Sequence, residues 1–74
     1  MEIRQENGVD FLVVIAGMRW ENEVSGVTVK VEENHFRVEG RIEGQAFTTR
    51  VYGPDAEEKA FSVASCIVRE LLGD

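Results

Sequence analysis

The pattern of apolar and polar positions changes once along the chain, at Pro54. Before Pro54, apolar residues tend to occupy every second position, which is typical of half-buried strands. After it they recur every three to four residues, which is typical of an amphipathic helix. Glycine, asparagine and Ser-Gly signals divide the first part into five candidate strands, at about residues 2–6, 9–17, 26–32, 35–42 and 45–52. With a helix over about residues 54–72, the sequence predicts an α+β fold, strands first and helix last.

The C-terminal segment shows the clearest periodicity in the chain. At about 100° per residue, apolar side chains that include Ala60, Phe61 and Val68 fall on one face of the expected helix. Pro54 suits a first helical turn, and Gly73 follows the last periodic residue, where it suits a helix end. We expect this helix to pack its apolar face across one face of a sheet.

Two expected two-residue turns determine how the middle strands pair. A turn at Glu33-Asn34 pairs Val29 with Val38, and an independent turn at Glu43-Gly44 pairs Val38 with Thr49. Both turns place the apolar pairs on the same face, although a slip of one residue would invert every side chain of a strand. Their agreement predicts an antiparallel three-stranded meander over residues 27–52.

The N-terminal part is expected to add a hairpin. Asn7-Gly8 is the strongest hairpin dipeptide in the chain, and a turn there pairs Ile3 with Leu12. Residues 18–26, which carry Trp20, form a connection that is longer than a hairpin loop. Whether this connection contains an extension of a strand stays open. The simplest architecture is a five-stranded antiparallel meander with the C-terminal helix on one face, all in a single domain of residues 1–74.

The second expected strand is apolar on both of its faces. One face presents Phe11, Val13 and Ile15. The other presents apolar side chains of its own and of the first strand: Leu12, Val14, Ala16, Met1 and Ile3. One helix covers one face of a small sheet, so the other face favours a partner surface. We expect a homodimer that uses Phe11, Val13, Ile15 and Trp20, unless the long connection with Trp20 folds over that face.

The polar face of the meander gathers positive charges. In the predicted register Lys30 opposes Arg37 and Arg37 opposes Arg50, which is unfavourable without relief. In one interpretation Glu32 and Glu39 neutralise this row diagonally, and the face is simply solvated. In the other, the face binds an anion, an acidic protein surface or a single nucleic-acid strand. The candidate residues of that face are Lys30, Arg37, Arg41, Arg50, Tyr52 and His35.

Composition and charge narrow the classes of partner. The chain has 74 residues, of which 43% are hydrophobic and 30% charged, as in ordinary folded domains. Its net charge of −6 disfavours coating of duplex DNA or of an anionic membrane, because phosphate binding needs an excess of basic side chains. Residues 1–26 and 54–74 each carry a net charge of −3, whereas residues 27–53 are neutral. The total therefore favours a positive partner surface without excluding a local anion site on the meander.

The inventory of reactive groups is small. Cys66 is the only cysteine and His35 the only histidine, so we expect neither an internal disulfide nor a Cys/His metal site. Nothing in the predicted fold brings a turn histidine beside a mid-helix cysteine, as a nucleophilic site would require. We expect no enzymatic activity, no metal and no cofactor.

The N-terminal region carries no targeting signal of the usual kinds. The longest apolar run, residues 11–16, is too short to span a membrane and follows acidic residues instead of a basic segment. We expect a cytoplasmic protein that does not bind membranes.

These observations predict a small acidic, non-enzymatic protein-binding module, such as an adaptor, an inhibitor or an immunity-type protein, that also self-associates. The alternative function is binding of single-stranded nucleic acid or another anion on the basic polar face of the sheet.

Overall fold

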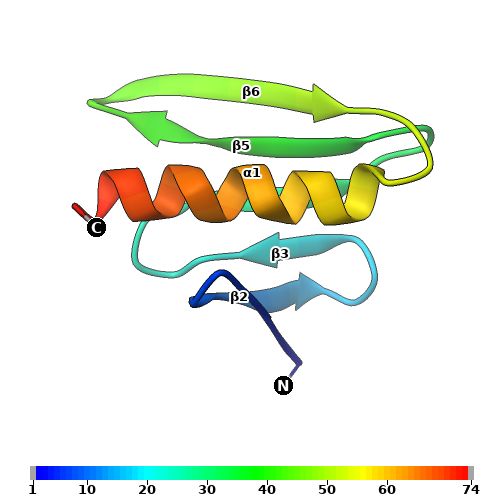
Figure 1. Ribbon diagram of the computed structural model, residues 1–74, viewed down its shortest axis with the longest axis horizontal. Coiled ribbons are helices and arrows are strands. Elements are labelled where there is room, and N and C mark those ends of the chain that lie inside the picture. Colours follow the sequence, from blue (N-terminus) through cyan, green and yellow to red (C-terminus); the bar gives the residue numbers. More distant parts are fainter. Residues whose placement is uncertain (1, 74) are drawn as a thin grey trace.

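The computed structural model describes residues 2–73 of the chain. Within them the elements follow the order β1 (Ile3–Glu6), β2 (Val9–Ile15), β3 (Arg19–Glu21), β4 (Thr28–Val31), β5 (Phe36–Ile42), β6 (Gln45–Val51) and α1 (Ala56–Leu71). The strands form one antiparallel sheet in meander order, and α1 lies across one of its faces (Figure 1). The predicted α+β class, with the helix last, is confirmed. Met1 lies outside the described residues.

The prediction of five strands is wrong by one, because residues 2–73 contain six. The additional strand is β3, which lies in the connection that separates the second and third expected strands. Its central residue, Trp20, pairs with Val13 on one side and with Val29 on the other. A strand of three residues is too short to display a period of two, so pairing with both neighbours, and not its own pattern, defines it.

The predicted hairpin registers are confirmed. Around Asn7-Gly8, Ile3 pairs with Leu12, and the two turn residues have φ angles of 50° and 78°. Around Glu43-Gly44 the corresponding angles are 51° and 82°. Positive φ at both central positions is the conformation that joins two strands with the right twist through two residues.

The middle of the sheet also has the predicted pairing. Val29 pairs with Val38, which in turn pairs with Thr49. At the turn between β4 and β5, the backbone N–H of Glu32 donates to the carbonyl of His35 at 3.0 Å. Both sides of the meander therefore keep their apolar residues on the face that α1 covers.

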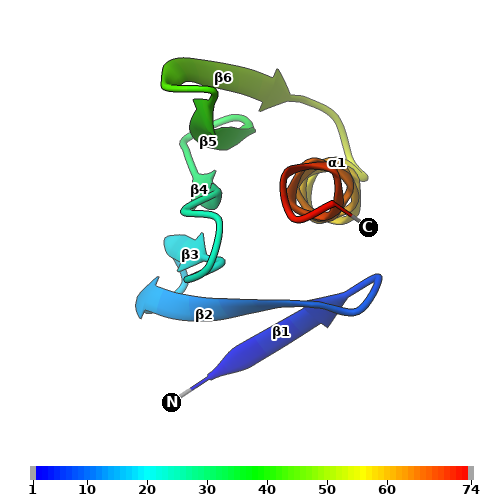
Figure 2. The same ribbon diagram turned by 90° about the vertical axis from the view of Figure 1, so that its left-hand side faces the viewer.

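The sheet curves around α1, so that β1 and β2 pass beneath the helix while β5 and β6 lie beyond its other side (Figure 2). We call the concave face, which meets α1, the inner face, and the opposite one the outer face. Phe61 of α1 lies in the middle of the core, with its ring edge-to-face against Phe11 at 5.4 Å and Trp20 at 5.9 Å between centroids. The core consists of Val9, Phe11, Val27, Val29, Val38, Ala60, Phe61, Ala64 and Val68.

Small side chains bring α1 close to the sheet. Ala56, Ala60, Ala64 and Val68 are buried and follow one another at intervals of four residues, so they form one line along the helix. Three alanines in that line leave room for the aromatic rings of the neighbouring strands. The helix is slightly shorter than predicted, since it begins at Ala56 instead of 54 and ends at Leu71 instead of 72.

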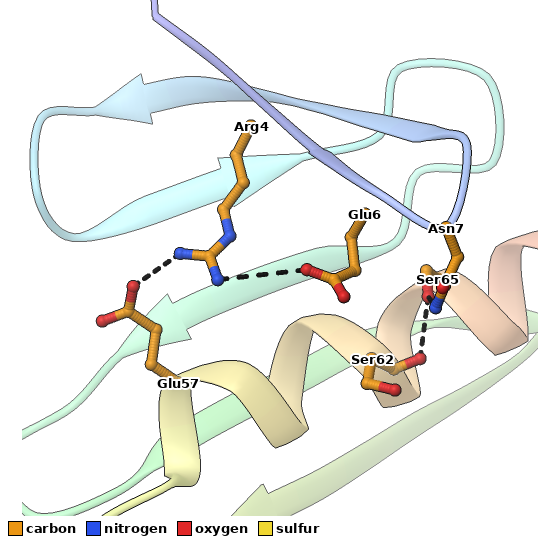
Figure 3. A network of polar contacts seen from close by, with 6 residues as sticks. All are labelled: Arg4, Glu6, Asn7, Glu57, Ser62 and Ser65. Atoms are coloured by element: carbon orange, nitrogen blue, oxygen red, sulfur yellow. Dashed lines mark hydrogen bonds and ion pairs between the residues drawn. The ribbon is translucent and has the colours of Figure 1, made fainter.

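Polar contacts fasten the N-terminal hairpin to the helix (Figure 3). Asn7 donates a side-chain hydrogen bond to Ser65 at 2.8 Å, and Ser65 donates to the backbone carbonyl of Ser62. Arg4 forms an ion pair with Glu57, and its guanidinium carbon lies 4.0 Å from the centre of the Phe61 ring. These contacts hold β1 beneath the helix.

Candidate functional site

The outer face of the sheet carries a continuous line of cations. Arg19 of β3 pairs with Lys30 of β4, Lys30 with Arg37 of β5, and Arg37 with Arg50 of β6. We call these four residues the basic row. The predicted line of Lys30, Arg37 and Arg50 is in place, and Arg19 extends it. Arg19 was not among the candidate residues because β3 was not recognised as a strand.

Two carboxylates neutralise the middle of the basic row. Glu39 contacts Lys30 at 2.8 Å and the Nε of Arg37 at 3.4 Å, and Glu32 contacts the other side of Arg37 at 2.7 Å. All four side chains are half-buried. The hydrogen bond from Lys30, with the charges of Lys30, Arg37 and Arg19, lowers the pKa of Glu39 below its ordinary value of 4.5, although desolvation opposes this shift. The two central cations are therefore already engaged.

The ends of the basic row are freer than its middle. Arg50 is exposed and has no ion pair within the part of the chain that the structure describes. At the other end, Arg19 has no ion pair among residues 2–73, and its Nε, like that of Arg37, is buried there without a hydrogen-bond partner. Arg19 also borders a shallow pocket of about 420 Å³ that Thr28, Arg41 and Thr48 help to line.

The other candidate residues of this face are divided between its two ends. His35 and Tyr52 lie together, with ring centroids 5.1 Å apart and ring planes inclined by 34°. Arg41 is at the opposite end of β5, where its guanidinium donates a hydrogen bond to the carbonyl of Gly44 in the turn. The structure therefore brings the ring pair beside the Arg50 end of the basic row, whereas Arg41 lies near Arg19, with which it lines the pocket.

Three of the four expected interface residues belong to the core and its margin. Phe11 is fully buried, and Val13 and Trp20 are half-buried on the inner face, where Trp20 contacts Phe61. This corrects the expectation that Phe11, Val13 and Trp20 form an exposed interface. The curvature of the sheet packs these residues of β2 and β3 against α1. Only Ile15, 51% exposed, remains at the surface.

A β-bulge in β2 explains why Ile15 lies on the outer face, whereas Phe11, Val13 and Trp20 lie on the inner face. Val13 pairs with Trp20, whereas Ile15 pairs with Arg19, so one extra residue, Val14, is inserted between the two pairs. The insertion turns Ile15 to the outer face, which a strict alternation from Val13 would not do. Strict alternation along β2 therefore predicted the wrong face of the sheet for Ile15.

Apolar side chains gather on the outer face at the β1–β2 end of the sheet. Ile3 pairs with Leu12, and Ile15 lies further along β2, next to Met18 in the following turn. Ile3, Ile15 and Met18 are each more than half exposed, and Leu12 is half-buried. We call these four residues the outer apolar patch. Within residues 2–73 no helix or strand covers it (Figure 2).

The reactive side chains are scattered. Cys66 is exposed on α1, and the Nδ1 of His35 lies 2.9 Å from the side-chain oxygen of Asn34 in the β4–β5 turn. Among residues 2–73, no three His, Cys, Asp or Glu side chains are grouped so that they could hold a metal ion. In the same part of the chain, no helix has the length and apolar character to cross a membrane.

Comparisons with family models, with curated proteins and with solved structures found no match to this chain.

Proposed function

We propose that this chain is a small, non-enzymatic protein-binding module that docks on another protein through the outer apolar patch. The observation that carries the proposal is the exposure of Ile3, Ile15 and Met18 on a face that α1 leaves open. Clustered large apolar side chains at the surface of a small protein are typical of a protein interface, because water is displaced from them when a partner binds.

Charges around the outer apolar patch indicate the kind of partner. Acidic groups border the Ile3–Leu12 part of the patch, because Leu12 pairs with Glu21 and Ile3 lies two residues from Gln5, which pairs with Asp10. At Ile15 the neighbour in β3 is basic, because Ile15 pairs with Arg19. Residues 1–26 as a whole carry a net charge of −3. A partner with an apolar centre and basic side chains opposite Glu21 and Asp10 matches this arrangement, since complementary charges at the rim of an interface steer association.

The neutralised middle of the basic row supports a protein partner over an anion. An anion at Lys30 or Arg37 has to compete with Glu32 and Glu39, which already hold both cations. The outer apolar patch has no such competitor among the described residues. The lone cysteine suits a reducing compartment, and the proposal places the protein in the cytoplasm.

The proposal is tested with Ile15→Glu, compared with Val24→Glu as a matched control. Val24 is apolar and 77% exposed but lies in the β3–β4 loop, outside the outer apolar patch. Tagged forms of the full chain are used to capture partners from nuclease-treated extracts of the native host. We expect the unchanged chain and Val24→Glu to retain the same protein and Ile15→Glu to lose it, because an apolar contact is lost and the new carboxylate is desolvated when the partner binds.

Equal capture by all three forms would show that the outer apolar patch is not the docking surface. No protein captured from the nuclease-treated extract, with nucleic acid retained from an untreated one, would contradict a protein partner altogether.

The second candidate function, binding of single-stranded nucleic acid, rests on one specific arrangement. The exposed ring of Tyr52 lies against His35, and the free end of the basic row, Arg50, is on the same face. Bases stack on aromatic rings while cations contact the phosphates.

Two double variants that remove equal charge test the binding of single-stranded nucleic acid. Arg19→Gln with Arg50→Gln removes the two free ends of the basic row, and Lys59→Gln with Arg69→Gln removes the same charge from the exposed side of α1. If the candidate is right, affinity for a labelled oligonucleotide falls with rising salt and falls further only in the first double variant. Equal affinities of the two variants, or no binding at about 50 mM salt, would exclude it.

A further inference from the structure

We propose that two copies of this chain associate through the free edge of β6, as a two-fold dimer with one continuous sheet. This surface is distinct from the outer apolar patch, so it goes beyond the proposed function. β6 is the last strand in the sheet order, seven residues long, and within residues 2–73 no strand lies on its other side. Figure 1 shows it along the margin of the molecule, with α1 over the sheet and not over this edge.

The edge lacks the features that usually prevent edge-to-edge pairing. Proteins protect such edges with prolines, bulges, very short strands or several charges. β6 contains no proline, pairs with β5 without interruption from Gln45 to Val51, and carries one charge, Arg50. The opposite edge, β1, has only four residues and carries Arg4 and Glu6. β6 is therefore the edge available for pairing.

The hairpin register determines which backbone groups of β6 are free. In a two-residue hairpin, the residues that flank the turn exchange both backbone hydrogen bonds, and every second pair after them does the same. The flanking pair is Ile42 and Gln45. Gln45, Phe47, Thr49 and Val51 therefore bond to β5, and the N–H and C=O groups that point outward belong to Ala46, Thr48 and Arg50.

A two-fold axis at Thr48 uses every one of these outward groups. It pairs Thr48 with Thr48 of the second copy and Ala46 with Arg50 of the second copy, so that no like charges oppose each other. An axis at Arg50 would oppose two arginines, which is unfavourable. An axis at Ala46 would pair Thr48 with Gly44 in the turn and leave Arg50 without a strand partner. The register centred on Thr48 is thus self-complementary.

Charge and side-chain pattern favour a second copy over a segment of another protein. Residues 27–53, which include β6, have no net charge, whereas the acidity of the chain is in its two terminal segments. The β6 edge is therefore the part of this acidic molecule where two copies repel each other least. On the inner face, the half-buried side chains of Phe47 and Val51 meet Thr49 and Gln45 of the second copy, which extends the inner face of the sheet.

The test measures the solution mass of the unchanged chain, of Thr48→Pro and of Gln5→Pro by sedimentation equilibrium at tens of micromolar. Proline at 48 removes an outward N–H and leaves the bonds to β5 intact, since proline is tolerated where the strand edge faces solvent. Gln5 is the matched control, because it is exposed and its N–H points outward from the other edge, one residue beyond the pair that flanks the Asn7-Gly8 turn.

We expect twice the chain mass of 8.3 kDa for the unchanged chain and for Gln5→Pro, and 8.3 kDa for Thr48→Pro. Thr48→Arg, a substitution at an exposed side chain, repeats the test without a change of backbone. It should also be monomeric, because it places two arginines across the axis. Circular dichroism shows which variants are folded, and the comparison uses the folded ones.

A mass of 8.3 kDa for the unchanged chain overturns the proposal, as does a dimer that persists in folded Thr48→Arg. If the unchanged chain is monomeric and Thr48→Arg no longer captures a host protein, the edge binds a segment of another protein, and the proposal of a dimer is overturned.

The Ile15→Glu variant distinguishes the dimer proposal from the proposed function. It should remain dimeric whether or not the outer apolar patch binds a partner, and its dissociation would assign the dimer contact to the patch.

Discussion

At Gly40 the absence of a side chain makes room for the ring of Phe47. A Cβ atom at Gly40 would lie 2.7 Å from Cε2 of Phe47 and 3.2 Å from Cγ2 of Val27. Both distances are shorter than ordinary van der Waals contact, so the ring, which belongs to the edge strand β6, would have to move outward.

Gly40→Ala should therefore destabilise the protein. Alanine restricts the unfolded chain and gains roughly 0.4–1 kcal/mol, but overpacking costs roughly 1–3 kcal/mol, so a net loss of about 1 kcal/mol is expected. In a domain of this size such a loss lowers the melting temperature by roughly 4–8 °C. Thermal unfolding followed by circular dichroism measures the change. The double variant Gly40→Ala with Phe47→Leu should recover part of the loss, and additive effects of the two changes would contradict this explanation.

The ion pair between Lys30 and Glu39 should appear in the pH dependence of stability. The pKa of Glu39 is lowered in the folded protein, chiefly by the hydrogen bond from Lys30, so folding favours its ionised form. That contribution is complete above the ordinary pKa of 4.5 and is lost as the pH falls through the lower folded pKa. Glu39→Gln should reduce the loss of stability below pH 4.5, measured by urea unfolding from pH 7 to pH 3.

The matched control for Glu39 is Glu33→Gln, an exposed position in the β4–β5 turn. It changes the charge equally but touches no member of the basic row in the ion pairs of residues 2–73. An equal effect of the two substitutions would mean that the acid dependence arises from total charge and not from the Lys30 contact.

Among the elements, the two hairpins with positive φ angles differ in how well their residues suit the turn. Asn7 and Glu43 have nearly the same φ, 50° and 51°, and each is followed by a glycine with positive φ. Asparagine tolerates the left-handed region, whereas other non-glycine residues pay roughly 1–2 kcal/mol there. The β5–β6 hairpin therefore holds strain at Glu43 that the β1–β2 hairpin avoids at Asn7.

Glu43→Asn should stabilise the protein by about 0.5–1 kcal/mol, because asparagine relieves part of this strain. The measurement is the midpoint of urea unfolding. Glu33→Asn serves as the control, since Glu33 is in a hairpin turn but is not among the non-glycine residues with positive φ in the described part of the chain. An equal gain from both substitutions would show that removal of a negative charge, and not the backbone conformation, is responsible.

At the scale of the whole molecule, one side chain of the helix, Phe61, contacts the three strands β1, β2 and β3. Phe61 is almost fully buried, contacts the rings of Phe11 and Trp20, and lies beneath the guanidinium of Arg4. A chain of 74 residues is expected to have a total stability of roughly 4–11 kcal/mol. Loss of the Phe61 ring should therefore remove a large part of the free energy of unfolding.

Phe61→Ala should cost about 3–5 kcal/mol, the usual range for a buried phenylalanine, and leave little or none of the cooperative unfolding transition. Phe61→Leu, which keeps most of the volume, should retain the transition at a lower urea midpoint. A loss below about 2 kcal/mol for Phe61→Ala would contradict the central place of this ring in the core.

Local rules were sufficient for a large part of this fold. The pairs Ile3–Leu12, Val29–Val38 and Val38–Thr49 followed from turn residues and alternation, because a two-residue turn leaves one register for the strands it joins. The same register aligned three cations of the basic row before Arg19 was known to be part of it. Helix periodicity likewise predicted the buried face of α1.

Tertiary contacts decided the rest. β3 exists because Trp20 lies between Val13 and Val29 and packs on Phe61, contacts between residues that are distant in sequence. The bulge at Val14 moved Ile15 to the outer face, and the curvature of the sheet buried Phe11. The sequence alone determined the three two-residue turns, the strand registers that they set, and the helix, since each depends on neighbouring residues. Which apolar side chains of β2 face solvent depends on how the whole sheet bends around α1, and only the tertiary structure decided it.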